Sequence, residues 1–215
     1  MASSPTAVVF DCDGTLADTE PLADQAWRDA LAELGYEATD DDFRAVIGRP
    51  YPQTFAYFAA RAPLGEAQEF RPRVRQRFQR LLDEQLRLHP DAEAAVRELA
   101  DRGVPLAVAS SSSHEHVVRI LEYGGIAHLV AVVVGADDVE RHKPDPQPYL
   151  VAADALGQAP GDCTAVEDTP VGITSARAAG LFTVGVVRGH FDRSDLDEAH
   201  RVVDRITSDS LLPGP

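Results

Sequence analysis

The sequence predicts an α/β fold, with a parallel sheet, helices on both faces of that sheet and a small α-helical domain inserted into the chain. Short apolar runs rich in β-branched residues alternate with helical patterns, which is typical of a helix-covered parallel sheet. These runs are continuously apolar, as in strands buried on both faces. One long stretch near the N-terminus has helical patterns and no strand candidate.

Five apolar runs are strand candidates. They are AVVF (7–10), PLAVA (105–109), VAVVV (130–134), CTAV (163–166) and FTVGVV (182–187). Helical patterns at 91–102, 114–123, 146–156 and 170–179 lie between them. Pro170 after the capping residue Thr169 marks the start of the last helix, and Gly180 marks its end. This order predicts a Rossmann-like core.

The inserted stretch has helical patterns at 21–34, 40–47, 53–61 and 66–87. In the last pattern an apolar stripe recurs at helical spacing, formed by Phe70, Val74, Phe78, Leu81, Leu82 and Leu86. We therefore predict an α/β core of residues 1–17 and 90–215 and an inserted helical domain of residues 18–89, which would lie over one edge of the sheet as a cap. The C-terminal stretch TSDSLLPGP is expected to be poorly ordered.

Composition limits the possible partners. The chain has 215 residues and a net charge of −15, which argues against a nucleic-acid or anionic membrane surface. Cys12 and Cys163 lie in or beside apolar runs and are expected to be buried free thiols. We find no signal-peptide pattern and no run long enough to span a membrane. We expect a cytoplasmic protein, either a monomer or a weak homodimer.

Polar residues follow four of the five strand candidates. They are Asp11 and Asp13 after 7–10, Ser110 after 105–109, Lys143 in the loop after 130–134, and Glu167 and Asp168 after 163–166. Singly, each could be a turn, a linker or a helix cap. Because the C-terminal ends of parallel strands meet at one edge of a sheet, where sites form, together they predict a functional site.

The charges of this set predict a metal ion. Four carboxylates and one ammonium sum to −3, which is unfavourable in a partly desolvated cleft without a counter-ion. Carboxylate oxygens without His or Cys ligands favour Mg²⁺ over Zn²⁺. A phosphate could then approach through the metal, Lys143, Ser110 and backbone N–H groups. The residues therefore predict metal-assisted phosphoryl chemistry.

Lys143 is the only lysine among the 20 Lys and Arg residues of the chain. Its ammonium is a compact point charge that can lie between a carboxylate and a phosphate, whereas the planar guanidinium of arginine is broader. We predict that the geometry of the site requires a lysine at this position.

Four segments resemble, in order and wording, the motifs of the haloacid dehalogenase-like hydrolases. They are DCDGTLADTEP, AVASSSS, HKPDPQPYLVAADALG and VEDTPVGITSARAAGL. They are most similar to the branch that holds β-phosphoglucomutase and phosphoglycolate phosphatase. The resemblance covers about residues 7 to 189, and the family's helical cap matches the inserted stretch.

The resemblance implies a role for each motif residue. Asp11 would be the nucleophile that forms an aspartyl-phosphate, and Asp13 the general acid and then the general base. Ser110 would hydrogen-bond the phosphoryl oxygens, and Lys143 would neutralise Asp11 and the phosphoryl group. Mg²⁺ would be held by Asp11, the backbone carbonyl of Asp13, Asp168 and, directly or through water, Glu167.

The resemblance leaves two reactions open, a phosphatase and a phosphosugar mutase. The mutases carry a histidine where this chain has Ala23, and an arginine where this chain has Tyr51. Both departures favour a phosphatase acting on a small phosphorylated metabolite, such as a sugar phosphate. Arg49 and Ser111 are candidates for substrate contact.

Two further interpretations remain open at this stage. The arginines of the segment FRPRVRQRFQR are read as a solvated helix face, and His114 and His116 as helix-surface residues. A phospho-accepting signalling receiver domain would also combine an Asp nucleophile, a hydroxyl and a lysine at a sheet edge. The chain length, the helical insertion and Asp13 argue against a receiver.

Overall fold

The computed structural model describes residues 6–46, 51–189 and 191–212. The chain divides into two compact units. The core unit holds the residues up to Asp18 and those from Arg87 onward, and the helical unit is Thr19–Leu86. Each unit has a buried hydrophobic cluster of its own. That the helical unit acts as a cap over the site stays a prediction.

The core unit is built on a six-stranded parallel sheet with the order β3-β2-β1-β4-β5-β6. The strands are β1 (Ala7–Phe10), β2 (Leu106–Ala109), β3 (Val132–Val134), β4 (Cys163–Glu167), β5 (Phe182–Val186) and β6 (Arg201–Val203). Every residue of β1, β2 and β4 is buried, as their continuous apolar runs predicted. The predicted α/β fold is confirmed.

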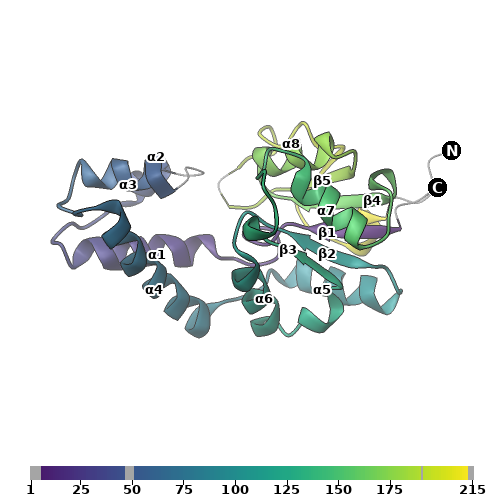
Figure 1. Ribbon diagram of the computed structural model, residues 1–215, viewed down its shortest axis with the longest axis horizontal. Coiled ribbons are helices and arrows are strands. Elements are labelled where there is room, and N and C mark those ends of the chain that lie inside the picture. Colours follow the sequence, from purple (N-terminus) through teal and green to yellow (C-terminus); the bar gives the residue numbers. More distant parts are fainter. Residues whose placement is uncertain (1–5, 47–50, 190, 213–215) are drawn as a thin grey trace. The chain divides into compact units, whose positions relative to one another are not determined.

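Helices cover both faces of this sheet (Figure 1). The longer ones are α5 (Pro90–Asp101), α6 (His114–Tyr123), α7 (Gln147–Ala155) and α8 (Pro170–Ala178). Residues of α7 and α8 pack in one cluster with Ala7 and Val9, the alternate residues of β1. In Figure 1, α5 and α6 lie on the other side of the strands. Short 3₁₀ helices occur at η1 (Ala127–Leu129), η2 (Ala136–Asp138) and η3 (Pro160–Asp162).

The strand register brings the predicted site residues to one edge of the sheet. Phe10, the last residue of β1, pairs with Val108 of β2 and with Val166 of β4. Asp11 and Glu167 therefore emerge side by side, and Ser110 follows the end of β2 next to them. These residues therefore lie together at the C-terminal edge of the sheet, as their positions after the strands predicted.

The C-terminal stretch is ordered, so the prediction of poor order is wrong for the described residues 207–212. Helix α9 (Ser208–Leu211) begins with a capping box, in which the Thr207 hydroxyl accepts a hydrogen bond from the N–H of Ser210 and the Ser210 hydroxyl accepts one from the N–H of Thr207. Leu211 is fully buried, and Thr164 of β4 donates to its carbonyl at 2.8 Å. Thr207 and Ser210, which suggested a poorly ordered C-terminal stretch, are instead capping residues of α9. Residues 213–215 lie outside the described part.

The helical unit contains α1 (Glu20–Ala32), α2 (Asp40–Val46), α3 (Tyr51–Ala59) and α4 (Ala67–Gln85). Its core is aromatic: the Trp27 ring lies 5.3 Å from that of Phe58 and 5.6 Å from that of Phe70, between centroids. The apolar stripe predicted for α4 is buried at Phe70, Val74, Leu81 and Leu82.

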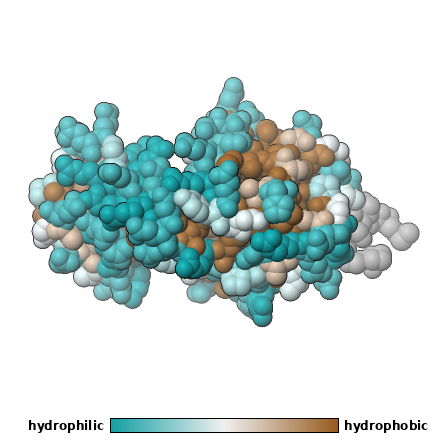
Figure 2. Space-filling model, turned by 90° about the horizontal axis from the view of Figure 1, so that it is seen from below, coloured by the Kyte–Doolittle hydropathy of each residue, from teal (hydrophilic) through white to brown (hydrophobic). Residues whose placement is uncertain are grey.

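The arginines of α4 largely confirm the interpretation as a solvated helix face. Arg71, Arg73, Arg75 and Arg80 are exposed, and Arg77 pairs with Glu33, the residue that follows α1. Figure 2 shows hydrophilic residues over most of the visible surface of the helical unit. Arg49, the predicted substrate contact, lies outside the described residues. Within the described part of the chain, no helix combines the length and apolar character that a membrane crossing requires.

Candidate active site

Asp11 follows the buried strand β1 directly and is itself buried. Its Oδ1 accepts a hydrogen bond from the Lys143 ammonium at 2.6 Å, across 132 positions of sequence. The two residues therefore meet as the strand-end argument predicted.

The Lys143 ammonium donates hydrogen bonds to three acceptors. Its Nζ donates to Asp11 Oδ1 at 2.6 Å, to Glu167 Oε1 at 2.6 Å and to the carbonyl of Ala109 at 2.9 Å. Its side chain is 4% exposed. Burial alone would lower the pKa of Lys143, but the carboxylates of Asp11 and Glu167 outweigh burial and raise the pKa well above its usual range. The residue remains an ammonium, with its three donors directed at three different segments.

Glu167 is held at both carboxylate oxygens. Oε1 accepts from Lys143 and from the Tyr149 hydroxyl at 2.8 Å, and Oε2 accepts from the Thr169 hydroxyl at 3.0 Å. Burial and the nearby Glu167 raise the pKa of Tyr149 well above its usual range, so Tyr149 keeps the proton that it donates. A Cβ on Gly172 would lie 1.8 Å from Glu167 Oε1, so only glycine leaves room for this carboxylate.

Asp168 is fixed by the loop that follows β1. Thr15 donates from its hydroxyl to Asp168 Oδ1 at 2.7 Å, between two buried side chains. Gly14 has a φ of +85°, and a Cβ at this position would lie 2.2 Å from Asp168 Oδ2. Glycine is therefore needed at position 14 for its backbone conformation and for the space it leaves. The turn that follows β1 therefore packs directly against the Asp168 carboxylate that follows β4.

Three buried carboxylates lie close together, and two of them contact the Lys143 ammonium. One oxygen each from Asp11, Glu167 and Asp168 lies within 4.8 Å of the others, close enough to hold one metal ion. With Lys143 the cluster carries −2 when ionised. Burial raises the pKa of Asp11 well above its usual range, and Glu167 and Asp168 act in the same direction while Lys143 opposes them. A divalent cation would bring the cluster to neutrality, and all three ligands are hard oxygens of the kind that Mg²⁺ takes.

The serine run lies beside this cluster. Ser110 is buried, and its hydroxyl oxygen accepts a hydrogen bond from the N–H of Ser112 at 3.0 Å. This hydrogen bond holds the Ser110 oxygen at the end of β2. Ser111 is exposed, and its contact with a substrate stays a prediction.

Asp13 has partners that the sequence did not indicate. Ser112 donates from its hydroxyl to Asp13 Oδ2 at 2.7 Å, and His116 Nε2 lies 3.2 Å from Asp13 Oδ1. The His116 side chain is only 16% exposed, so the interpretation of this residue as a helix-surface position is wrong. No motif signals this contact, because His116 reaches Asp13 across 103 positions of sequence.

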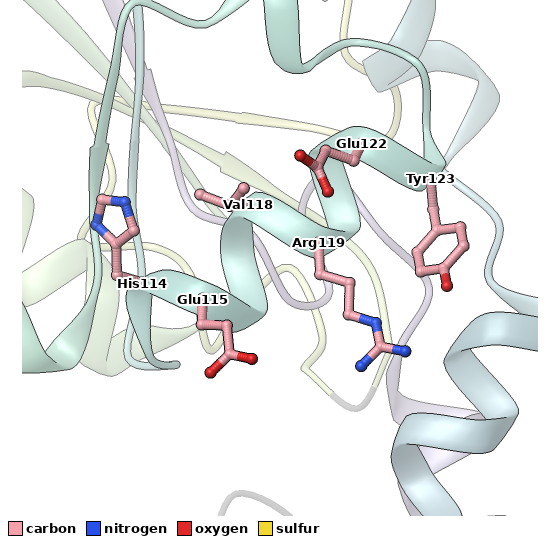
Figure 3. Close-up of a pocket in the computed structure, with 6 residues that line it drawn as sticks. All are labelled: His114, Glu115, Val118, Arg119, Glu122 and Tyr123. Atoms are coloured by element: carbon pink, nitrogen blue, oxygen red, sulfur yellow. The ribbon is translucent and has the colours of Figure 1, made fainter.

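His114 behaves differently, although it lies on the same helix. Its ring Nδ1 lies 2.7 Å from Asp138 Oδ2, and its side chain is 45% exposed. Figure 3 shows His114 with Glu115, Val118, Arg119, Glu122 and Tyr123, which line a surface hollow along α6. The hollow does not include the acidic cluster. His114 therefore belongs to the exposed side of α6, as the sequence interpretation expected.

Comparison with known proteins assigns the family. The family profile described as haloacid dehalogenase-like hydrolase matches residues 5–180. The chain belongs to the haloacid dehalogenase-like hydrolases, and the predicted resemblance is confirmed. The alternative of a signalling receiver domain is thereby removed.

Two relatives that match over nearly their full length are phosphatases by name. A phosphorylated carbohydrates phosphatase of Thermotoga maritima is 30% identical over 91% of this chain and 92% of its own. A validoxylamine A 7′-phosphate phosphatase of Streptomyces hygroscopicus subsp. limoneus is 32% identical over 93% of each chain. Among solved structures, a Thermotoga maritima protein named provisionally as a β-phosphoglucomutase superposes with a TM-score of 0.83, is 30% identical, and the match covers 92% of this chain and 93% of that one.

Proposed function

We propose that the protein is a Mg²⁺-dependent phosphatase that hydrolyses a small phosphomonoester, such as a sugar phosphate, through an aspartyl-phosphate. The observation that supports this most strongly is the buried cluster in which the Lys143 ammonium joins Asp11 and Glu167 at 2.6 Å each. Phosphoryl transfer needs alignment and charge stabilisation more than elaborate covalent chemistry, and this cluster offers both.

In the first step, a carboxylate oxygen of Asp11 attacks phosphorus, and the ester P–O bond breaks. Asp13 gives its proton to the departing oxygen, so the alcohol leaves neutral. Ser110 donates a hydrogen bond to a phosphoryl oxygen, and Lys143 offsets the charge shared by Asp11 and the phosphoryl group. In the second step, Asp13 takes a proton from water, whose oxygen bonds to phosphorus as the bond to Asp11 breaks. Phosphate leaves, and Asp11 and Asp13 return to their first states.

The carboxylates of Asp11, Asp168 and Glu167 and the backbone carbonyl of Asp13 would hold Mg²⁺. When bound, the ion supplies positive charge that offsets the charge of the carboxylates and of the phosphoryl oxygens. Glu167 would hold the ion directly or through water, because its oxygens lie within reach of the same position as those of Asp11 and Asp168.

A phosphosugar mutase is the second candidate, since a structural relative is named provisionally as a β-phosphoglucomutase. In a mutase a sugar hydroxyl takes the place of water in the second step. Ala23 on α1, where the mutases carry histidine, supports the phosphatase instead. The substrate is expected to be a small phosphorylated metabolite, since two relatives are named for phosphorylated carbohydrates and for validoxylamine A 7′-phosphate.

The test is phosphate release from a panel of small phosphomonoesters, including β-glucose 1-phosphate, with Mg²⁺ and with a chelator. We expect many turnovers with Mg²⁺, none with the chelator, and none in Asp11→Asn. Asp101→Asn, an exposed carboxylate at the end of α5, is the matched control and should keep the wild-type rate. Formation of glucose 6-phosphate after priming with a bisphosphate would favour the mutase. A single phosphoryl group that stays on the protein would contradict both candidates.

A further inference from the structure

The carboxylate of Asp13 is held between two side chains of the segment that follows β2. Ser112 lies in the turn before α6, and His116 lies in the first turn of α6. Ser112 Oγ is 2.7 Å from Asp13 Oδ2, and His116 Nε2 is 3.2 Å from Asp13 Oδ1. Each oxygen of this carboxylate therefore has its own partner, and both partners come from one short stretch of chain.

That stretch is itself anchored on the loop after β3. Asp137 accepts from the N–H of His114 at 2.6 Å, and the N–H of Ala136 donates to the carbonyl of Ser112 at 2.8 Å. A Cβ on Gly135 would lie 2.2 Å from the backbone nitrogen of His114, so the loop and the start of α6 pack closely. The start of α6, and with it the ring of His116, has little freedom to move away from Asp13.

Both partners can form a hydrogen bond to a carboxyl group that gains and loses a proton during the reaction. A serine hydroxyl and a neutral imidazole can each donate one hydrogen bond and accept another. Ser112 can therefore bond Asp13 in either protonation state, and His116 Nε2 donates to Asp13 in one ring tautomer and accepts from it in the other. Arginine, by contrast, can only donate, so it could not accept a hydrogen bond from the protonated carboxyl.

We propose that Ser112 and His116 are positioning residues, which hold the Asp13 carboxyl for proton transfer in both steps of the reaction. This inference rests on the proposed function, in which Asp13 gives and takes a proton. A misplacement of about 1 Å in a reacting group can cost about 100-fold in rate, so loss of the His116 contact should slow the steps that need Asp13.

Comparing esters with poor and good leaving groups distinguishes this positioning role from a purely structural one. An alkyl phosphate releases a poor leaving group, which needs the proton of Asp13. The nitrophenolate of p-nitrophenyl phosphate departs without one. Loss of positioning should therefore slow the phosphorylation of Asp11 by the alkyl ester and spare its phosphorylation by the nitrophenyl ester.

The experiment measures single-turnover phosphorylation of the Mg²⁺-loaded enzyme by both esters, with the alkyl ester taken as the best of the panel. His116→Phe keeps a ring and removes the nitrogen. We expect it to slow the alkyl ester about 10- to 100-fold and the nitrophenyl ester less than about 3-fold. His116→Gln, whose amide nitrogen can replace Nε2, should recover part of the loss. His128→Asn, at an exposed histidine of η1, is the control and should match the wild type with both esters.

An equal loss with both esters would overturn the inference, and so would no loss with either. If His116→Phe does not fold, Ser112→Ala carries the same prediction and the same two contrary results. A wild-type enzyme that releases phosphate from neither ester would contradict the proposed function instead, so the two failures are distinguishable.

Discussion

Lys143 explains why a chain that relies on arginine keeps one lysine. One nitrogen contacts oxygens of Asp11, Glu167 and Ala109, all within 2.9 Å. An ammonium reaches three converging acceptors from one atom, whereas a guanidinium spreads its donors over a plane. Because the side chain is buried among these acceptors, a larger head group has no room without moving one of them.

Lys143→Arg should lower turnover about 10²- to 10³-fold, the range seen when one donor that stabilises transition-state charge is lost. The steady-state rate of phosphate release measures this loss. Arg141→Lys exchanges the same two residue types two positions earlier, where the side chain is exposed and pairs with Asp145, and should leave the rate unchanged. A Lys143→Arg enzyme with most of the wild-type turnover would show that the shape of the cation does not matter.

Gly172→Ala tests the space kept for Glu167. The added Cβ would lie 1.8 Å from Oε1, so the carboxylate must leave the position where Lys143, Tyr149 and Thr169 hold it. Since partners of metal ligands typically contribute 10- to 100-fold to metal affinity, we expect the Mg²⁺ dissociation constant to rise by about that factor. Isothermal titration measures it without relying on turnover. Gly161→Ala meets no atom within 4 Å and should bind Mg²⁺ as the wild type does; unchanged binding in both variants would refute the argument.

The sequence predicted the residues that bear the charge and missed those that orient them. Asp11, Lys143 and Glu167 could be found because strand ends share one edge of a parallel sheet. Tyr149 and His116 could not, because a tyrosine or histidine in a helical pattern looks the same whether it packs in the core or reaches a carboxylate. Their partners lie 18 and 103 positions away, and such distant pairs follow only from the folded chain.

At the scale of helices and strands, local hydrogen bonds of polar side chains set where elements begin. Asp42 in α2 accepts from the N–H and the hydroxyl of Thr39 at 2.8 and 2.9 Å, from the Tyr57 hydroxyl at 3.0 Å and from the Tyr36 hydroxyl at 3.1 Å. Burial alone would raise the pKa of Asp42, but these hydrogen bonds lower it below its usual value. An ionised Asp42 therefore stabilises the start of α2 and its contacts within the helical unit.

The lowered pKa gives this stabilisation a definite pH dependence. Above the usual carboxyl pKa of about 4, Asp42 is ionised in the folded and the unfolded chain, and its stabilising effect is fully present. The effect is lost as the pH falls through the lowered folded-state pKa. Asp42→Asn should therefore lower the urea midpoint at pH 7, with a difference from wild type that shrinks toward pH 3. Asp41→Asn, with 85% of its side chain exposed, should show little difference at either pH. A constant difference for Asp42→Asn across this range would contradict the assignment.

The C-terminal helix α9 should contribute to stability because Leu211 is fully buried. Leu211→Ala is expected to lower the free energy of unfolding by about 2–4 kcal/mol, the cost of a cavity at a buried leucine. Leu150→Ala, at a leucine that is 39% exposed, is the matched control and should cost much less. Equal and small losses in equilibrium unfolding would mean that α9 adds little to the core.

The predictability of the elements depended on their length and pattern. The helix at 114–123 and the strand at 7–10 agree with α6 and β1 residue for residue, because continuous or periodic apolar patterns define them. β6 has only three residues, all half-buried, and α9 has four. Segments this short carry too little periodicity to be recognised, and their order comes from contacts with the rest of the core unit.

For the whole molecule, the net negative charge comes partly from the buried carboxylate cluster and partly from charged side chains on the surface. The chain carries −15, and the cluster of Asp11, Glu167, Asp168 and Lys143 contributes −2 of it when ionised. Charges spread over an exposed surface are screened by salt, whereas a buried cluster is screened much less. A divalent cation in the cluster should therefore stabilise the folded chain, and monovalent salt should not replace it.

Mg²⁺ should raise the melting temperature. At 100 times the dissociation constant, binding to the folded state adds about 2.7 kcal/mol, or roughly 5–10 °C for a chain of this size. Differential scanning fluorimetry with Mg²⁺, at matched ionic strength, measures the shift. Asp168→Asn should lose most of it, and Asp101→Asn should keep it. A shift of the same size in Asp168→Asn would mean that Mg²⁺ acts on the acidic surface rather than on the cluster.

In the proposed mechanism, Asp11 carries the phosphoryl group between the two steps. The most direct measurement is rapid quenching of Asp13→Asn with p-nitrophenyl phosphate and Mg²⁺, followed by mass spectrometry of the proteolysed chain. Since this ester needs no proton and the variant cannot activate water, we expect the phosphoryl group to accumulate on the peptide that carries Asp11. Nitrophenol release with no phosphoryl group on that peptide, or with the group on another residue, would contradict the account.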